Sequence, residues 1–394
     1  MADGPLTHLR VLELGTLIAG PFCGQLFGDM GADVIKIEAP GIGDPMRSWG
    51  RGLPVWWPVI ARNKRCITLN LRIPAGQELL KRLLQDSDVL IENFRPGTME
   101  KWGLDYEALS TINPGLVMVR VSGFGQSGPY SSRAGYGSIG EAMGGIRYLA
   151  GDPDRPPSRV GLSIGDSLAA TFACVGALAA LHERDRTGHG QVVDSAIYEA
   201  VLAVMESTIP EYTEGGEIRE RSGAILPKIA PSNVYPTADD DSIVMGANQD
   251  SVFTRLAEAM GNPSLAEHPD YADHVSRGEH QEELDELIGR WTITLDAAVL
   301  LQQLEAHGVP AGRIYRAPEM LEDPHFQARE SIVDVDHPAF KNLKMQNIFP
   351  KLSRSQGKIR WPGPELGAHN AEIYRDLLEI SDETLQDLIH DGVV

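Results

Sequence analysis

One aspartate occupies a position that gives its carboxylate two possible uses. Asp166 lies in Gly165-Asp166-Ser167, directly before the apolar run 168–181, which predicts a buried helix. As an N-cap, the side chain would only bind the first free N–H groups of that helix. As a catalyst, the carboxylate would be kept ionised by the helix dipole, beside N–H groups that can hold a developing oxyanion. The residues alone leave both uses open.

Two glycine-rich turns are further candidates for ligand binding. The segment 123–129 (GFGQSGP) follows an expected strand, at the edge where open α/β sheets bind ligands. It lacks the Lys-Ser/Thr ending of a Walker A motif, and a simple tight turn explains it equally well. The turn 15–20 (GTLIAG) departs from the dinucleotide fingerprint, because its middle positions carry side chains that would keep a pyrophosphate from the helix N-terminus. An NAD site is therefore disfavoured, although Glu38 ends the next expected strand.

No pattern predicts a metal centre or an activated serine. The 11 histidines are scattered, and neither H-E-x-x-H nor G-x-S-x-G occurs. Cys23, Cys66 and Cys174 are widely spaced and odd in number, which predicts free thiols in a reducing compartment. We therefore expect no metal and no tightly bound cofactor.

Strands and helices alternate over the first 125 residues. The expected strands are 9–14, 33–38, 88–94 and 116–122, and the expected helices are 21–30 and 74–85. Near-continuous apolar strands alternating with helices predict a parallel sheet covered on both faces, which is an α/β doubly wound architecture. The segments 141–184 and 195–211 are expected to be mainly helical.

The second half of the chain changes character after a polar stretch. Residues 212–231 are polar and contain three glycines, which is typical of a linker or crossing segment. A strand (242–246) and charged amphipathic helices (281–291 and 296–307) then predict a smaller second domain. A closing helix is expected over 370–379.

Size and charge narrow the functional classes. The chain has 394 residues, 42% hydrophobic and 23% charged, which is typical of a soluble globular protein with a large core. Its net charge of −20 argues against duplex nucleic acid or an anionic membrane as the main partner. The longest apolar helix, about 14 residues, is shorter than the roughly 20 that a membrane span requires. With no signal peptide expected at the N-terminus, these features predict a cytoplasmic enzyme.

Read together, these motifs resemble the family III CoA-transferases (the CaiB/BaiF family), which include formyl-CoA transferase and carnitine CoA-transferase. The matching segments are 11–47 (VLELGTLIAGPFCGQLFGDMGADVIKIEAPGIGDPMR), 62–72 (RNKRCITLNLR), 88–109 (DVLIENFRPGTMEKWGLDYEAL), 121–145 (VSGFGQSGPYSSRAGYGSIGEAMGG) and 161–201, together with the end of the chain. The likeness covers nearly the whole chain and keeps the order of the motifs.

The resemblance implies an interlocked homodimer of two-domain subunits. A large Rossmann-like domain with a parallel sheet is built from both chain ends, residues 1–211 and 326–394. Residues 212–232 form a linker, and residues 233–325 form an inserted smaller α/β domain.

The resemblance also implies a reaction. Asp166 matches the nucleophilic aspartate of the family, which moves CoA from an acyl-CoA donor to a carboxylic acid through an aspartyl anhydride and an aspartyl thioester. Succinyl-CoA or another short-chain acyl-CoA is the expected donor, and acyl-CoA is a substrate rather than a bound cofactor. Arg47, Arg147 and Arg219 are candidates for binding a second carboxylate.

Positions that contact CoA in the family carry over by motif. They are Ile18, Ala19, Leu69, Arg72, Asn93, Phe94, Lys101, Arg133 and Tyr136. Arg72 and Lys101 are expected to pair with phosphates. Gly137 departs from the family, because many relatives carry an acidic residue there. The compact segment 244–249 replaces a long glycine-rich loop of formyl-CoA transferases and disfavours oxalate/formate exchange.

Two other functions remain open at this point. An α-methylacyl-CoA racemase needs two bases on opposite faces of its substrate, one of them a histidine in an A-G-H-D motif. Here that motif reads Ala134-Gly135-Tyr136-Gly137. A non-catalytic acyl-CoA-binding protein would keep the CoA contacts but lose the nucleophile, whereas Gly165-Asp166 is retained.

Overall fold

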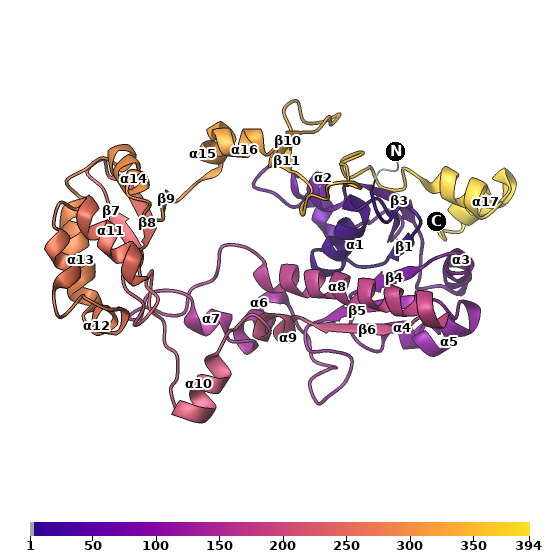
Figure 1. Cartoon of the computed structure of the whole chain (residues 1–394). Helices are drawn as coiled ribbons and strands as arrows, with labels where there is room; N and C mark the ends of the chain where they lie inside the picture. Colours follow the sequence, from indigo (N-terminus) through magenta and orange to yellow (C-terminus); the bar gives the residue numbers. More distant parts are fainter. Residues whose placement is uncertain (1–3) are drawn as a thin grey trace. The chain divides into compact units, whose positions relative to one another are not determined.

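A computed structural model describes residues 4–394, which divide into two compact units (Figure 1). The large unit contains residues 4–147, Val160–Pro210 and Ala328–Val394. The second unit contains Tyr148–Arg159 and Glu211–Gln327. Both ends of the chain thus belong to one unit.

Six parallel strands form the centre of the large unit, in the order β3-β2-β1-β4-β5-β6. They are β1 (Arg10–Glu13), β2 (Asp33–Glu38), β3 (Lys64–Thr68), β4 (Val89–Glu92), β5 (Val117–Ser122) and β6 (Val192–Ala196). The strand order reverses between β1 and β4, and ligands of such sheets bind outside the carboxyl ends of the strands at this point. The predicted α/β class with a Rossmann-like parallel sheet is confirmed.

Successive side chains of a strand point to opposite faces of the sheet, and here both faces carry buried apolar side chains. Helices cover both faces. In β5, Val117 and Val119 join a core with α1 (Ala19–Asp29), α8 (Ile164–Thr187) and α9 (Ile197–Leu202).

On the other face, Met118 joins a core with α3 (Pro74–Leu84) and α5 (Tyr106–Ile112). The C-terminal η3 (Glu372–Leu377, a π-helix) and α17 (Asp382–His390) complete that second core, and Figure 1 shows them in yellow beside the N-terminal strands.

By length and composition alone, helix α8 is long and apolar enough to cross a membrane. Its small residues, from Ala169 to Ala180, are buried against the sheet and α1, so one face of the helix belongs to the core. The predicted buried core helix is confirmed on this face. The other face leaves Phe172, Val175 and Leu178 exposed.

The prediction of a long helix over 195–211 is wrong. Ser195 and Ala196 end the edge strand β6, which pairs with β5. A short α9 follows, and α10 (Thr208–Gly215) is separate. The apolar residues of this stretch fit either structure locally, and pairing with β5 selects the strand.

The second unit has its own sheet and core. Strands β7 (Ser232–Pro236), β8 (Ser242–Gly246) and β9 (Ala311–Arg313) are antiparallel. Helices α11 (Asp250–Ala259), α13 (Gln281–Thr292) and α14 (Ala297–Ala306) pack their apolar residues in the same core. The expected strand 242–246 and the two expected amphipathic helices are present.

The remaining elements are short. They are η1 (Pro45–Ser48), α2 (Trp56–Ile60), α4 (Thr98–Lys101), α6 (Gly137–Met143), α7 (Ile146–Leu149), η2 (Pro263–Glu267), α12 (His274–Glu279), α15 (Ala317–Glu322), α16 (Pro324–Ala328), β10 (Ile332–Asp334) and β11 (Lys344–Gln346). The three cysteines are free, as predicted, and all three are buried.

Candidate functional site

The turn after β1 is fixed by a side chain from the neighbouring strand. Asn93, just after β4, accepts a hydrogen bond from the Thr16 N–H at 2.8 Å and donates one to the Thr16 carbonyl at 2.9 Å. A carboxamide that bonds both polar atoms of one residue determines the position of that backbone. The turn therefore lies at the carboxyl ends of β1 and β4, where the strand order reverses.

The next residue of the turn, Leu17, is held in place by side chains from β2 and from the loop that follows it. Leu17 has a φ of 64°, which is unusual for leucine. Asp44 accepts hydrogen bonds from the N–H groups of Leu17 at 3.1 Å and Met46 at 2.9 Å. Lys36 donates to the Gly15 carbonyl and pairs with Asp44 at 3.0 Å. Side chains, rather than glycine, thus stabilise this conformation.

Beneath the turn lies a buried group of charges. Glu13 pairs with Lys36 at 3.1 Å and with Lys64 at 2.7 Å, and all three side chains are fully buried. A side chain at Gly24 would place its Cβ 1.9 Å from Oε2 of Glu13, so the glycine of α1 leaves the space for this carboxylate. Removing one member of such a group leaves an uncompensated buried charge.

The titration of these groups follows from burial and from their partners. Burial acts to lower the pKa of Lys36, but Glu13 and Asp44 outweigh it and raise this pKa above its usual value. Burial acts to raise the pKa of Asp44, yet Lys36 and the N–H of Met46 hold it below its usual value. The pKa of Lys64 is lowered by burial, against the effect of Glu13. Lys36 and Asp44 thus remain an ion pair at neutral pH.

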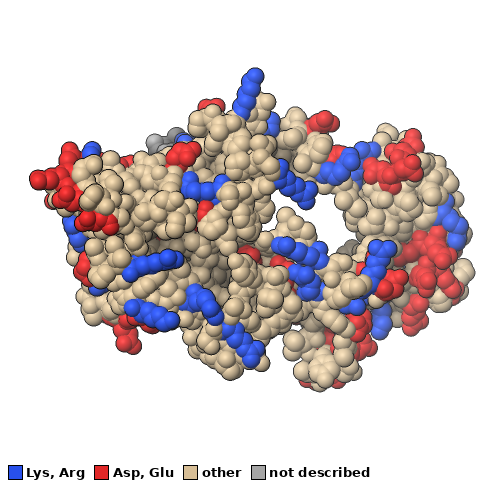
Figure 2. Space-filling view, turned by 180° about the vertical axis from the view of Figure 1, so that it is seen from behind, with Lys and Arg blue, Asp and Glu red and all other residues tan. Residues whose placement is uncertain are grey.

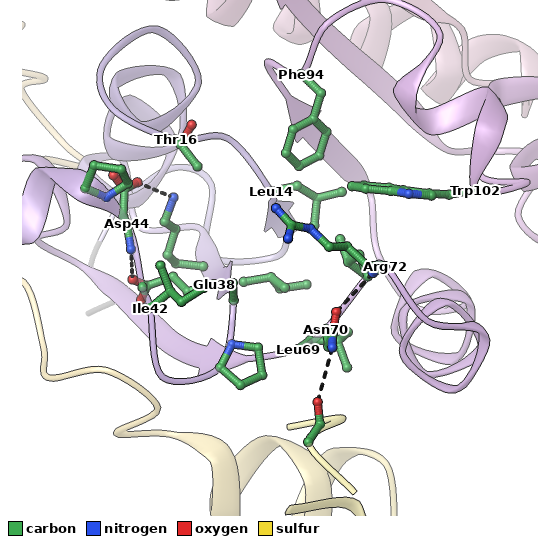
Figure 3. A pocket seen from close by; sticks show the side chains of 18 residues that line it. Leu14, Thr16, Glu38, Ile42, Asp44, Leu69, Asn70, Arg72, Phe94 and Trp102 are labelled. Atoms are coloured by element: carbon green, nitrogen blue, oxygen red, sulfur yellow. Dashed lines mark hydrogen bonds and ion pairs between the residues drawn. The ribbon is translucent and has the colours of Figure 1, made fainter.

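A cavity of about 500 Å³ opens beside this turn (Figure 3). It is lined by Leu14, Thr16, Lys36, Ile37, Glu38, Ala39, Pro40, Ile42, Gly43, Asp44, Pro45, Leu69, Asn70, Leu71, Arg72, Phe94, Trp102 and Gly392. Phe94 and Trp102 meet edge to face, with ring centroids 5.3 Å apart. In Figure 3 the guanidinium of Arg72 extends toward Leu14 and Phe94. Lys36 is paired with acidic residues, so Arg72 is the cation that the lining offers. Apolar walls with this cation suit a ligand that has a flat ring and an anionic group.

Asp166 lies in the first turn of α8 and is half-buried. The N-cap is Ser163, so the structure does not use Asp166 as the cap of this helix. A Cβ on Gly137, the first residue of α6, would lie 2.2 Å from Oδ2 of Asp166. The carboxylate therefore lies directly against the start of α6.

A second, fully buried carboxylate holds α6 and α8 together. Glu141 of α6 accepts a 2.9 Å hydrogen bond from Arg147. Its other oxygen accepts the N–H of Gly165, next to Asp166, at 3.5 Å. The start of α8 is thus tied to α6 beside the candidate nucleophile.

Charge is unevenly distributed between the units. Asp and Glu outnumber Lys and Arg in the second unit, and Figure 2 shows acidic side chains gathered on it. Local cations of the large unit, such as Arg72, are the available contacts for an anionic ligand. Among residues 4–394, no group of three or more His, Cys, Asp or Glu side chains is arranged to hold a metal ion.

Comparison with known proteins identifies the family. The profile described as CoA-transferase family III matches residues 6–370. The chain belongs to this family. This family III CoA-transferase is 61% identical over 385 residues to the succinyl-CoA–D-citramalate CoA-transferase of Chloroflexus aurantiacus, covering 97% of this chain and 96% of that protein.

Two further comparisons agree with this assignment. The CoA-transferase is 41% identical over 391 residues to the β subunit of the succinyl-CoA–L-malate CoA-transferase of Chloroflexus aurantiacus, covering 98% of this chain and 96% of that protein. A crystal structure of a CaiB/BaiF family protein from Brucella suis superposes with a TM-score of 0.84 at 34% identity, covering 95% of this chain and 100% of that one. The predicted family and α/β fold are confirmed.

The predicted CoA contacts of this transferase lie in different parts of the structure. Leu69, Arg72 and Phe94 line the cavity, whereas the exposed Lys101 ends α4 outside its lining. Ile18 and Ala19 are buried at the start of α1, directly after the turn held by Asn93.

Arg133 and Tyr136 lie in the loop that leads to α6. Arg133 stacks over Tyr130, with its guanidinium carbon 3.5 Å from the ring centroid, and Tyr136 is the exposed N-cap of α6. Tyr136 directly precedes Gly137, whose backbone lies against the Asp166 carboxylate, and neither Arg133 nor Tyr136 lines the cavity.

Sequence reasoning missed several residues of the site. Lys36, Asp44 and Trp102 carry no motif of their own, and only the fold brings them to the cavity. Arg47 was a candidate for binding a substrate carboxylate, but its guanidinium makes two 2.7 Å hydrogen bonds to Glu38. Arg219 is paired with Glu211. Arg147, the third candidate, bonds Glu141 at 2.9 Å, so all three arginines are engaged within the protein.

Proposed function

We propose that this protein transfers CoA from succinyl-CoA to a hydroxy-dicarboxylic acid of the D-citramalate type, with Asp166 as the nucleophile. The observation that carries the proposal is the 61% identity, over nearly the whole of both chains, to a succinyl-CoA–D-citramalate CoA-transferase. The L-malate enzyme subunit, at 41% identity, also acts with a hydroxy-dicarboxylic acid.

In the proposed reaction, each bond broken at a carbonyl carbon is replaced by a similar one. A carboxylate oxygen of Asp166 attacks the carbonyl carbon of the succinyl thioester, and the C–S bond breaks. The products of this step are a mixed anhydride between succinate and Asp166 and free CoA thiolate. The thiolate then attacks the Asp166 carbonyl carbon and releases succinate, which leaves an aspartyl-CoA thioester. The acceptor carboxylate repeats both steps in reverse order, yielding acceptor-CoA and free Asp166. Covalent catalysis divides one difficult exchange into similar, easier steps.

The position of Asp166 fits this role. A half-buried carboxylate in the first turn of a 24-residue helix is stabilised as an anion by the helix dipole. The tie between Glu141 and Gly165 fixes the backbone next to it. A nucleophile fixed in this way loses less orientational freedom when the thioester arrives.

The cavity beside the first turn is the proposed site of the nucleotide part of CoA. Phe94 and Trp102 offer aromatic surface, and Arg72 offers a cation for a phosphate. Lys101, Arg133 and Tyr136 are proposed as further contacts outside the cavity lining. We propose no tightly bound cofactor, because CoA enters and leaves as a substrate.

We further propose an interlocked homodimer in the cytoplasm. Phe172, Val175 and Leu178 leave an apolar stripe of α8 exposed in the single chain, and a second copy would cover it. Three buried free thiols fit a reducing compartment. Sedimentation that shows only compact monomer at micromolar concentration would contradict the dimer.

The test of the proposed substrates is a direct exchange assay. The purified protein is incubated with succinyl-CoA together with one acceptor at a time: D-citramalate, L-malate or acetate. The thioesters that form are identified by mass spectrometry. We expect D-citramalyl-CoA to form together with free succinate, and acetate to be a poor acceptor. Exchange with acetate but with neither dicarboxylic acid would contradict the proposed substrate class.

A further inference from the structure

Two distant parts of the sequence share one wall of the cavity beside the first turn. Segment 69–72, which directly follows β3, lines the cavity, and so does Gly392, which comes 322 positions after Asn70. The N–H of Asn70 donates a 2.8 Å hydrogen bond to the carbonyl of Val393. The side chain of Asn70 donates a second one, from Nδ2 to the carbonyl of Gly392 at 3.3 Å. Figure 3 shows Asn70 between Arg72 and this C-terminal segment, which is drawn in yellow.

The end of α17 directs residues 392–394 toward Asn70. Gly392 has a φ of 66°, in the left-handed region, where glycine is favoured after the last turn of a helix. The N–H groups of Gly392 and Val393 bond carbonyls of that last turn at 3.1 and 2.9 Å. Val393 and Val394 are buried in the core that contains α3. The position of the Val393 carbonyl is therefore fixed by core packing.

Asn70 connects this fixed segment to Arg72. Its Oδ1 accepts the N–H of Arg72 at 3.2 Å. On the other side, a Cβ on Gly76 of α3 would lie 2.0 Å from the carbonyl oxygen of Asn70, so the start of α3 packs directly against this residue. Asn70 is thus held between α3 and residues 392–394. The backbone of Arg72 is held with it, while the exposed guanidinium extends into the cavity.

We propose that residues 392–394 are a structural part of the CoA site, and that Asn70 is the positioning residue through which they hold Arg72 at the cavity. This inference rests on the proposed CoA site. Without this contact, segment 69–72 would have to be ordered each time CoA binds, and that ordering lowers affinity. The chemical step should be unaffected, because Asp166 and its neighbours in α6 and α8 are unchanged.

The test measures the Kd of CoA by isothermal titration calorimetry. A variant that lacks residues 392–394 is compared with Leu385→Ala. Leu385, in α17, is buried in the same core but lies outside the cavity lining, so it controls for lost core packing. We expect the deletion to raise the Kd of CoA and the KM for succinyl-CoA about tenfold, and to leave kcat within about twofold. Leu385→Ala should bind CoA as the wild type does. An unchanged Kd in the folded deletion variant would overturn the inference.

A side-chain substitution tests the same contact if the deletion variant does not fold. Asn70→Ala keeps residues 392–394 and the core, and should raise the Kd of CoA about threefold or more. Combined with Arg72→Ala, it should weaken binding little beyond Arg72→Ala alone, because residues that act together are not additive. Asn342→Ala, at an exposed residue, is the control. An unchanged Kd in Asn70→Ala, or losses that add in the double variant, would contradict the role of Asn70.

Failure of the proposed substrates is distinguishable from failure of this inference, because the Kd of CoA does not depend on the acids exchanged. A wild-type protein that binds CoA but does not transfer it from succinyl-CoA to D-citramalate contradicts the proposed substrates. The effect of the deletion on the Kd of CoA would still decide the inference.

Discussion

The carboxamide of Asn93 bonds both backbone polar atoms of Thr16, at 2.8 and 2.9 Å. This contact joins the ends of β1 and β4 at the point where the order of the strands reverses. Asn93 was expected to contact CoA, whereas the structure uses its side chain to fix the turn beside the cavity. Its influence on CoA binding would then act through the backbone of residues 15–18.

Replacing Asn93 should destabilise the protein and weaken CoA binding together. Asn93→Ala leaves the N–H and the carbonyl of Thr16 without their partner, which costs about 1–3 kcal/mol in the free energy of unfolding. Asn93→Asp keeps the acceptor but removes the donor, so it should not restore stability. Denaturant unfolding and the KM for succinyl-CoA measure the two effects. Asn262→Ala, at an exposed residue of the second unit, is the control; an equal loss there would contradict the assigned role.

Arg72 should contribute to CoA binding through charge. Its guanidinium lies at the cavity, so Arg72→Ala should raise the KM for succinyl-CoA about five- to a hundredfold and leave the KM of the acceptor acid nearly unchanged. The effect should shrink with added salt, since the residue is exposed. Lys101→Ala tests the predicted second phosphate contact, and Lys341→Ala is an exposed-lysine control. A KM for succinyl-CoA within about twofold of wild type in both variants would exclude this phosphate site.

His369 should make stability depend on pH. Its Nδ1 accepts the N–H of Cys66 in β3 at 3.1 Å, and burial lowers the pKa of His369 below its ordinary value of 6.5. The unfolded chain therefore binds the proton first, so the free energy of unfolding should fall as pH drops from 6.5 through the lower folded-state pKa.

The measurement is denaturant unfolding between about pH 7.5 and about pH 5.5. His369→Asn keeps an acceptor that does not titrate, and it should lose less stability than wild type over this range. His189→Asn, at an exposed histidine, should follow the wild type. Equal pH dependence in wild type and His369→Asn would contradict the role of this residue.

Elements defined by local pattern could be predicted from the sequence. The strand expected over 33–38 coincides with β2. Its apolar, β-branched residues directly follow Gly31, the glycine that marks the end of the preceding helix. The last two residues of the edge strand β6, Ser195 and Ala196, were mistaken for the start of a helix, because the pairing of β6 with β5 is not local.

The site was predictable where a motif marks it and not elsewhere. The resemblance made Asp166 the candidate nucleophile, and the structure shows why the local N-cap interpretation is wrong: Ser163 occupies that position. Gly137 was recognised only as a departure from relatives, since sequence reasoning could not place it against the Asp166 carboxylate. Lys36 in β2 and Asp44 in the following loop meet because this loop turns back over the end of the strand, where the N–H of Asp44 bonds Glu38.

Whether CoA becomes covalently attached to Asp166 tests the proposed mechanism most directly. Wild-type protein is incubated with succinyl-CoA without an acceptor, trapped with hydroxylamine and digested, and its peptides are analysed by mass spectrometry. We expect an aspartyl hydroxamate at residue 166 that depends on succinyl-CoA. Asp166→Ala should fold normally, form no hydroxamate and lose exchange activity roughly a thousandfold or more. Wild-type exchange activity in Asp166→Ala, or a hydroxamate found only at another residue, would contradict Asp166 as the nucleophile.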